Sequence, residues 1–186
     1  MTRLIAGTAG GTRLITPAGR DTRPTSDRVR EALFSRLESG GWLDGSVVLD
    51  LYAGTGALGL EALSRGARSA LLVEQAPHVV KALRANVSTA GLPGARVVAD
   101  SVERALARPA PEPADLVLAD PPYPLPDDAV ARVLRLLADG GWLADDALVV
   151  VERANRSTRP AWPDVLHDDG DKQYGTTRLW FARTRP

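Results

Sequence analysis

The chain has 186 residues, of which 44% are hydrophobic and 25% are charged, as in a globular protein with one α/β domain and a small appendage. It has no cysteine, which excludes disulfides, thiolate metal sites and a cysteine nucleophile. Basic and acidic residues are equal at 23 each, and the sequence contains neither a signal peptide nor a membrane span. We therefore expect a cytoplasmic protein with no membrane partner.

The charges are distributed unevenly along the chain. Residues 1–36 hold seven arginines against three acids, and residues 153–186 hold seven basic residues against four acids. If these two ends meet in space, they form a basic face suited to a nucleic acid. Only two of the basic residues are lysines, so a compositional bias of the genome toward arginine explains the pattern equally well.

An N-terminal hairpin and a helix come first. The runs RLIA and TRLIT flank GTAGG and predict a small hairpin, followed by a turn at Pro17-Ala18-Gly19. Ser26 is expected to cap a helix that ends at Gly40-Gly41, because apolar residues recur between them at helical spacing.

Strands and helices then alternate. Strands are expected at 47–49, 70–73, 96–99, 116–119 and 148–151, and helices at 57–65, 77–90, 101–108 and 127–138. The strand runs are apolar along most of their length, which predicts an α/β fold whose parallel sheet is covered on both faces.

The C-terminal section breaks this alternation. Residues 162–169 and 175–183 are strand-like and leave little room for a crossover helix, so they predict an antiparallel hairpin at the end of the sheet. We interpret Asp168–Asp171 as the turn of that hairpin, because the cluster lacks the remaining ligands of a calcium loop. His78 and His167 are isolated, so no metal site is expected.

A glycine-rich turn follows the first long strand. Gly54, Gly56 and Gly59 match G-x-G-x-x-G, and Glu74 lies 20 residues beyond Gly54, a spacing that dinucleotide enzymes also use. Asp50 distinguishes a dinucleotide site from a site for S-adenosylmethionine, because its carboxylate would repel the pyrophosphate of a dinucleotide at the helix N-terminus. It would instead suit the cationic amino group of S-adenosylmethionine, and a hydride-transfer constellation is also missing, so a nicotinamide dehydrogenase is disfavoured.

Carboxylates end four successive strands. Asp50, Glu74, Asp100 and Asp120 should therefore lie at the edge of the sheet where open α/β sheets bind ligands. We expect the nucleoside of S-adenosylmethionine to span Glu74 and Asp100, with its methionine end near Asp50 and Gly54.

The last of these acids opens the run Asp120-Pro121-Pro122-Tyr123. The Asp120 carboxylate and the Pro121 carbonyl are two acceptors for the hydrogens of a planar amino group, and the prolines restrict the backbone that holds them. Tyr123 is placed to stack on a base that has left its neighbours. The run predicts methyl transfer to an exocyclic amine, although by itself it is also a rigid turn.

Together these motifs identify a family resemblance. The chain resembles, nearly end to end, the bacterial 16S rRNA guanine-N(2)-methyltransferases that modify guanine 966, through RLIAG at 3–7, RPTSDRVREALF at 23–34, LDLYAGTGALGLEAL at 49–63, DPPY at 120–123 and YGTT at 174–177. The stretch at 23–34 is the most specific of these, whereas the glycine loop and DPPY occur in many amino-methyltransferases. Thr55 stands where family members can have serine.

The resemblance implies a Rossmann-like Class I methyltransferase fold, with seven strands of which the last is antiparallel, and an N-terminal β-hairpin extension. The extension would cover residues 1–22, here called the N-terminal extension, and the methyltransferase domain residues 23–186. The protein is expected to be a monomer that acts on 16S rRNA in the small ribosomal subunit or its assembly intermediate.

The resemblance also implies roles for individual residues. Asp120, Pro121, Pro122 and Tyr123 would hold the guanine. S-Adenosylmethionine would be held by Asp50, Tyr52, Gly54, Gly56, Glu74, Asp100 and Ser101. Arg3, Arg13, Arg23, Arg28 and Arg30 would contact RNA, and for each of them a structural ion pair is nearly as good an interpretation.

Two further hypotheses stay open. DPPY alone does not distinguish guanine in rRNA from adenine or cytosine in DNA, although the chain lacks a sizeable target-recognition insertion. A non-catalytic rRNA-binding assembly factor would keep the same fold, although an intact DPPY argues for turnover.

Overall fold

The computed structural model describes residues 2–17 and 27–185. Arg23, the expected cap Ser26 and the expected boundary between residues 22 and 23 lie outside the described residues.

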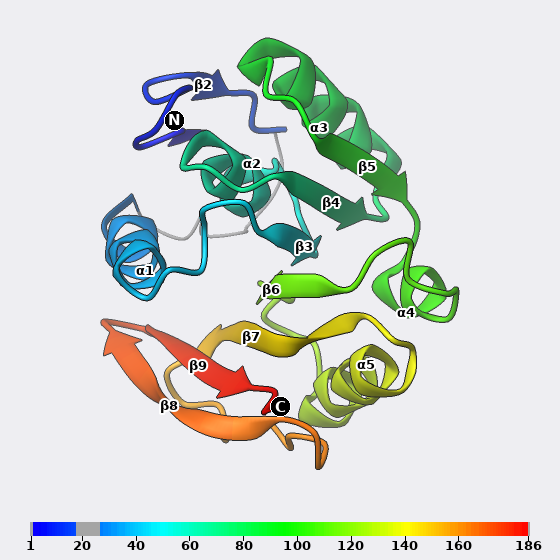
Figure 1. Cartoon of the computed structure of the whole chain (residues 1–186). Helices are drawn as coiled ribbons and strands as arrows, with labels where there is room; N and C mark the ends of the chain where they lie inside the picture. The colour runs from blue at the N-terminus through cyan, green and yellow to red at the C-terminus, as the bar shows by residue number, and fades with distance from the viewer. Residues whose placement is uncertain (1, 18–26, 186) are drawn as a thin grey trace.

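A seven-stranded sheet forms the middle layer of the molecule, with the strand order β5-β4-β3-β6-β7-β9-β8 (Figure 1). Its strands are β3 (Val47–Leu51), β4 (Ser69–Glu74), β5 (Ala95–Ala99), β6 (Ala114–Ala119), β7 (Leu143–Ala154), β8 (His167–Tyr174) and β9 (Thr177–Arg183). The pairs from β5 to β7 are parallel, whereas β9 is antiparallel to both β7 and β8. This confirms the expected α/β fold with an antiparallel last strand.

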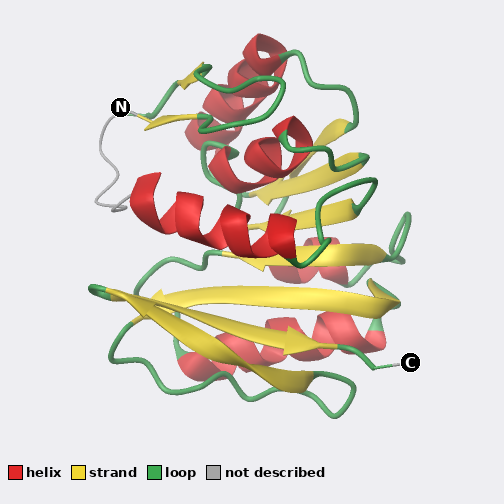
Figure 2. Cartoon of the chain, turned by 60° about the vertical axis from the view of Figure 1, so that its left-hand side comes forward, coloured by secondary structure: helices red, strands yellow, loops and turns green. Residues whose placement is uncertain are grey.

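Helices cover both faces of this sheet. They are α1 (Asp27–Ser39), α2 (Ala57–Ser64), α3 (Pro77–Ala90), α4 (Val102–Leu106) and α5 (Asp127–Asp139). Figure 2 shows α1, α2 and α3 on one face and α4 and α5 on the other. None of the helices in residues 2–17 and 27–185 is long and apolar enough to cross a membrane.

Alternating side chains of the central strands pack into two separate hydrophobic cores, one on each face of the sheet. In β6, Leu116 and Leu118 pack with α1 and α2, whereas Val117 packs on the opposite side with α4 and α5. Since successive side chains of a strand point to opposite faces, a sheet covered on both sides needs apolar residues at every position. This is why the strand runs of the sequence are apolar along most of their length.

The C-terminal hairpin corrects one prediction. Asp168–Asp171 lies inside β8 and is not the turn; the strands reverse at Gly175 and Thr176 instead. Between Asp168 and Asp171 the pairing with β9 is irregular, with Gly170 at φ 89° and its N–H donating to the Asp168 carboxylate at 2.7 Å. Such a bulge uses the same residue types as a turn, so composition alone does not separate the two.

Two other elements differ from prediction in length. The helix expected at 101–108 is only Val102–Leu106, and Ser101 precedes it as its N-cap. The strand expected at 148–151 extends over Leu143–Ala154, because β7 pairs along one edge with β6 and along the other with β9.

The described part of the N-terminal extension, residues 2–17, is a loop with one short strand pair. β1 (Thr2–Arg3) and β2 (Arg13–Leu14) are antiparallel and only two residues long each, so the expected hairpin forms with very little sheet. So short a ladder is marginal by itself. The extension therefore depends on its contacts with the rest of the molecule.

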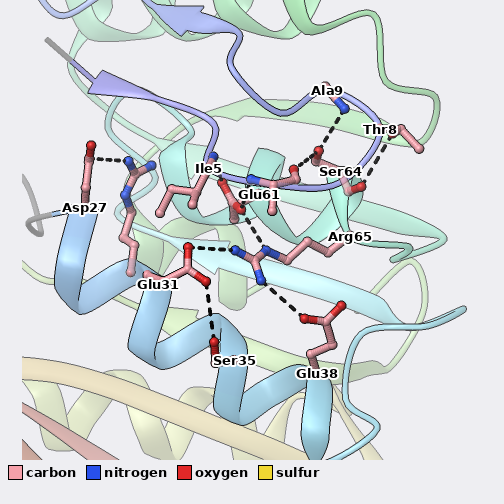
Figure 3. Close-up of polar contacts among 12 residues, drawn as sticks. Ile5, Thr8, Ala9, Asp27, Glu31, Ser35, Glu38, Glu61, Ser64 and Arg65 are labelled. Carbon is pink, nitrogen blue, oxygen red and sulfur yellow. Dashed lines mark hydrogen bonds and ion pairs between the residues drawn. The ribbon is translucent and has the colours of Figure 1, made fainter.

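Those contacts are concentrated on α2 (Figure 3). The buried Glu61 carboxylate accepts the backbone N–H groups of Ile5 at 2.7 Å and Ala6 at 3.0 Å, and also the Nε–H of Arg65 at 2.7 Å. Ser64 accepts the Ala9 N–H at 2.9 Å. The carboxylate thus has three donors, which is what a buried charge requires.

Arg65 extends this network to α1. Its guanidinium lies 3.5 Å from Glu31 and 3.4 Å from Glu38, and it sits over the ring of Phe34. The N-terminal extension, α1 and α2 are therefore joined through one polar network, in which Glu61 and the Arg65 side chain are buried and the two glutamates of α1 are exposed. The helix that starts at the glycine-rich turn is α2.

Candidate active site

A cleft of about 490 Å³ opens at the carboxyl edge of the sheet. The predicted residues that line it are Asp50, Tyr52, Gly54, Glu74, Asp100, Asp120, Pro121, Pro122 and Tyr123. Gly56 and Ser101 do not line it, and Thr2, Thr16 and Pro17 of the N-terminal extension do. The four acids at successive strand ends therefore do meet in one cleft, as the sheet topology requires.

Asp50 is the most buried of these acids, with 1% exposure. Its pKa is raised to about 8, mainly by burial; the hydrogen bond from the Gly59 N–H at 2.8 Å lowers the pKa, and the nearby charges of Asp120 and Glu74 raise it. A Cβ at Gly59 would lie 3.0 Å from the Asp50 carboxylate and 2.8 Å from Leu72, so only glycine lets α2 approach so closely. Asp50 is thus held protonated near neutral pH until a cation arrives.

Glu74 holds the glycine-rich turn in place. Its carboxylate accepts the Gly54 N–H at 3.0 Å and the Ala76 N–H at 2.9 Å. Gly54 and Gly56 have φ values of 57° and 84°, which a side chain would strain. Gly56 faces away from the cleft, where a Cβ would lie 2.6 Å from Leu83, so its role is to turn the chain into α2.

Tyr52 is the non-glycine residue with positive φ among the described residues, at 62°. Such a backbone conformation is uncommon outside glycine, asparagine and aspartate. It persists where the surrounding structure holds it in place, as is frequent at functional sites. Its hydroxyl is buried and has no hydrogen-bond partner in the described part of the chain, and burial raises its pKa. Tyr52 therefore brings an unused donor to the wall of the cleft.

Asp100 is already engaged by its neighbours. Its carboxylate accepts the Ser101 N–H at 2.9 Å and the Arg108 guanidinium at 2.6 Å, with Arg104 at 3.4 Å. Ser101 accepts the Arg104 N–H at 3.2 Å and caps α4. Ser101 thus has a structural role as the cap of α4, and its contact with the cofactor stays a prediction, while Asp100 lines the cleft.

The run from Asp120 to Tyr123 forms the opposite wall. Pro121 is buried, whereas the Tyr123 ring is 56% exposed. The loop turns back through a hydrogen bond from the Leu125 N–H to the Pro122 carbonyl at 2.9 Å. The aromatic ring is therefore presented to solvent on a stiff turn.

Arg153, near the end of β7, anchors this turn and was not predicted from the sequence. Its guanidinium donates to the Leu125 carbonyl at 2.8 Å and to Asp127 at 2.7 Å, and Thr158 also donates to Asp127 at 2.7 Å. Hydrogen bonds from Thr158 and Arg153 hold the pKa of Asp127 below its ordinary value. A charged residue directly after the apolar run of β7 was the available signal.

Asn86 of α3 is a second residue that the sequence did not reveal. Its amide accepts the Ile15 N–H at 2.7 Å and donates to the Ile15 carbonyl at 3.0 Å and to the Thr55 carbonyl at 2.9 Å. It is fully buried and so ties the N-terminal extension directly to the glycine-rich turn. An asparagine within the apolar face of a helix was the only sign of this role.

The arginines predicted to contact RNA separate into two groups. Arg3, Arg13 and Arg28 are exposed, while Arg23 lies outside the described residues. Arg30 is 1% exposed and lines the cleft, so it lies apart from the exposed arginines, and its contact with RNA stays a prediction. The helical period places it on the inner face of α1, because the buried Leu33, Phe34 and Leu37 follow it three, four and seven positions later. No cluster of acids and histidines within the described residues could hold a metal ion.

Comparisons with known proteins agree with this geometry. The Escherichia coli ribosomal RNA small subunit methyltransferase D is 40% identical over 165 residues, 87% of this chain and 79% of that protein. The Bacillus subtilis protein YlbH is 33% identical over 98% of this chain and 99% of its own length. The solved structure of the Escherichia coli protein yhhF matches with a TM-score of 0.87 and 36% identity, covering 99% of this chain and 98% of that one.

The family described as conserved hypothetical protein 95 matches residues 2–183. This range includes the N-terminal extension, the glycine-rich turn and the loop from Asp120 to Tyr123, so it spans every part of the cleft. The chain therefore belongs to the conserved hypothetical protein 95 family, and it is a methyltransferase homologous to the ribosomal RNA small subunit methyltransferases D.

Proposed function

We propose that the protein transfers a methyl group from S-adenosylmethionine to the exocyclic 2-amino group of a guanine in 16S rRNA. The observation that carries this proposal is the convergence of Asp50, Glu74, Asp100 and Asp120 on one cleft beside the exposed ring of Tyr123. The name of the Escherichia coli relative supports small-subunit rRNA as the substrate.

The cofactor side of the cleft fits S-adenosylmethionine by its chemistry. Asp50 offers a buried carboxylate to the amino group of the methionine end, and Glu74 and Asp100 offer acceptors to the ribose hydroxyls and the adenine amine. The cofactor supplies a methyl group on a sulfonium, which needs neither a metal nor a covalent enzyme intermediate. The protein has only to bind and orient the two reactants.

On the substrate side, the Asp120 carboxylate and the Pro121 carbonyl would accept the two N–H hydrogens of the guanine 2-amino group. This orientation directs the nitrogen lone pair at the methyl carbon, so that the C–N bond forms as the C–S bond breaks. The sulfur keeps the electron pair of the broken bond, and the surplus proton leaves the nitrogen along its hydrogen bond to Asp120. Tyr123 would stack on the extruded base.

The location, the oligomeric state and the RNA contacts of the protein are part of the same proposal. We propose a cytoplasmic monomer that contacts 16S rRNA, in the small ribosomal subunit or its assembly intermediate, through the exposed Arg3, Arg13 and Arg28. Residues 1–22 would act as an RNA-contacting extension and residues 23–186 as the methyltransferase domain.

The test offers S-adenosylmethionine labelled in its methyl group with three substrates: small subunits from a methylation-deficient strain, bare 16S rRNA and duplex DNA. Mass spectrometry of the digested nucleic acid then identifies the methylated nucleotide and atom. We expect N(2)-methylguanosine in rRNA. Label that appears only in DNA would overturn the proposal, and binding of particles without any turnover would favour the assembly-factor hypothesis.

A further inference from the structure

The charged side chains that line the cleft are mostly acidic, and the proposed reaction assigns no role to the basic one among the described residues, Arg30. The described lining residues of the cleft include the acids Asp50, Glu74, Asp100, Asp120 and Glu152, and Arg30 is the cation among them. A ligand that fills such a cleft must offer positive charges or hydrogen-bond donors to the acids, and a negative charge or an acceptor to Arg30.

The guanidinium of Arg30 is buried, and only some of its hydrogen-bond donors have a partner among the described residues. Its Nη2 donates to the Arg3 carbonyl at 2.8 Å and to the Asp27 carboxylate at 2.8 Å. Its Nε and Nη1 are buried and have no hydrogen-bond partner among the described residues. Leaving buried donors of a charged group unbonded is costly, so a site of this kind is completed by a ligand.

The two bonds that Arg30 does make hold the side chain in place. Asp27 lies one helical turn earlier on α1, and the Arg3 carbonyl belongs to β1 of the N-terminal extension. These bonds use Nη2, which both bidentate edges of a guanidinium share, so Arg30 offers an anion its positive charge and the separate N–H donors of Nε and Nη1 at a fixed orientation.

We propose that Arg30 binds the α-carboxylate of the methionine end of S-adenosylmethionine and is thus a cofactor-binding residue. This inference rests on the proposed function and deepens it. The methionine end carries an ammonium and a carboxylate side by side, and the cleft provides a buried acid, Asp50, and a buried guanidinium, Arg30, for those two charges.

A phosphate of the RNA backbone has the same acceptor chemistry, but the surroundings of Arg30 disfavour it. The carboxylates of Asp120 and Glu152 line the same cleft and would repel a phosphate bound inside it. A single carboxylate attached to a cationic molecule meets no such repulsion. The distribution of charge therefore favours the cofactor over the RNA as the partner of Arg30.

The experiment compares two ligands that differ only in the proposed contact: S-adenosylmethionine and its decarboxylated form, in which a hydrogen replaces the carboxylate. Calorimetry on the wild-type protein should show about 10- to 100-fold weaker binding of the decarboxylated form, the usual value of hydrogen bonds to a charged group. Equal affinity of the wild-type protein for both ligands would overturn the inference without any substitution.

The variant Arg30→Gln should then lower the affinity for S-adenosylmethionine by about 10- to 100-fold and leave that for the decarboxylated form unchanged. A merely structural arginine would weaken both ligands equally, which would refute the proposal. Arg30→Lys retains a charge and should show an intermediate preference, provided that thermal melting shows it folded. Arg84→Gln, at an exposed arginine of α3, is the control and should leave both affinities unchanged.

The same measurements distinguish a failure of the role of Arg30 from a failure of the proposed methyl transfer. If wild-type protein binds neither ligand, the proposed function fails first. If Arg30→Gln instead weakens binding of the 16S rRNA particle while cofactor affinity stays unchanged, Arg30 contacts a phosphate and the inference is wrong.

Discussion

The two walls of the cleft are stabilised in different ways. On the cofactor side, Asp50 and Glu74 are buried and accept backbone N–H groups of the glycine-rich turn and α2. On the substrate side, Asp120 and Tyr123 lie on a loop whose contacts include the turn from Pro122 to Leu125 and the hydrogen bond from Arg153 to the Leu125 carbonyl, and the Tyr123 ring is exposed.

This difference matches what each wall must receive. A small cofactor binds in a pocket whose groups are preorganised, because every fixed group lowers the entropy cost of binding. A base that arrives on a large RNA needs an open entrance and a flat ring to stack on. Substitutions on the two walls should therefore have separable effects, on cofactor affinity at one and on turnover at the other.

The largest effect is expected at Asp120. Replacing Asp120 with alanine removes one of two acceptors that orient the amine, and turnover should fall by roughly 10²- to 10³-fold. Binding of S-adenosylmethionine, measured by calorimetry, should change little. Asp128→Ala, at an exposed acid in the first turn of α5, is the control. Unchanged turnover in Asp120→Ala would show that the reacting amine does not bind at this wall.

On the opposite wall, Asp50→Asn should weaken cofactor binding by about 10- to 100-fold, because the ammonium loses its charged partner. The shape of the side chain and its acceptor for the Gly59 N–H are retained. Since ammonium binding favours the ionised acid, wild-type protein should release a proton on binding the cofactor below pH 8, seen as a buffer-dependent enthalpy. Asp50→Asn should show no such release from this group.

Asp50 also makes stability depend on pH in the absence of cofactor. The folded protein holds a proton on Asp50 up to a pKa of about 8, whereas the unfolded chain releases it near 3.8. The folded state therefore binds more protons between these values, and this contribution to stability falls as the pH rises from about 4 to about 8. Denaturant unfolding of Asp50→Asn should lack this slope; an identical slope in both proteins would contradict the assignment.

A smaller effect is expected when the substrate loop loses its anchor. Arg153→Met leaves the Leu125 carbonyl and Asp127 without their shared donor, so turnover should fall by about tenfold through poorer orientation of Asp120. Cofactor affinity should hold. Arg153→Lys keeps the charge but loses the fork, and should recover only part of the rate. An equal loss of cofactor affinity would show that the two walls are not independent.

The smallest effect is expected outside both walls, at the exposed arginines of the N-terminal extension. Replacing Arg3 and Arg13 with alanine should weaken binding of the 16S rRNA particle by a few-fold and flatten its salt dependence, because each phosphate contact releases about 0.7 to 0.9 of a counterion. The Arg3 carbonyl that Arg30 requires is retained. An unaltered slope in a filter-binding titration would place these residues away from the RNA.

Much of the fold followed from local patterns. Runs of apolar residues defined the strands, because a sheet covered on both sides is apolar at every position. The helices at 57–65 and 77–90 were predicted to within one residue of α2 and α3. The C-terminal turn was misplaced because a β-bulge and a turn require the same glycine and aspartate residues.

The order of the elements and the position of the four acids at strand ends follow from the sequence alone, since parallel strands bring their carboxyl ends to one edge. Which polar residues from other elements support that edge depends on the packing of the folded chain. Arg30, Asn86 and Arg153 look like ordinary helix or strand residues in the sequence, and their partners lie 27, 71 and 28 positions away. Such pairings depend on how helices pack on the sheet, which no local pattern encodes, and they place Arg30 inside the cleft and not on the surface.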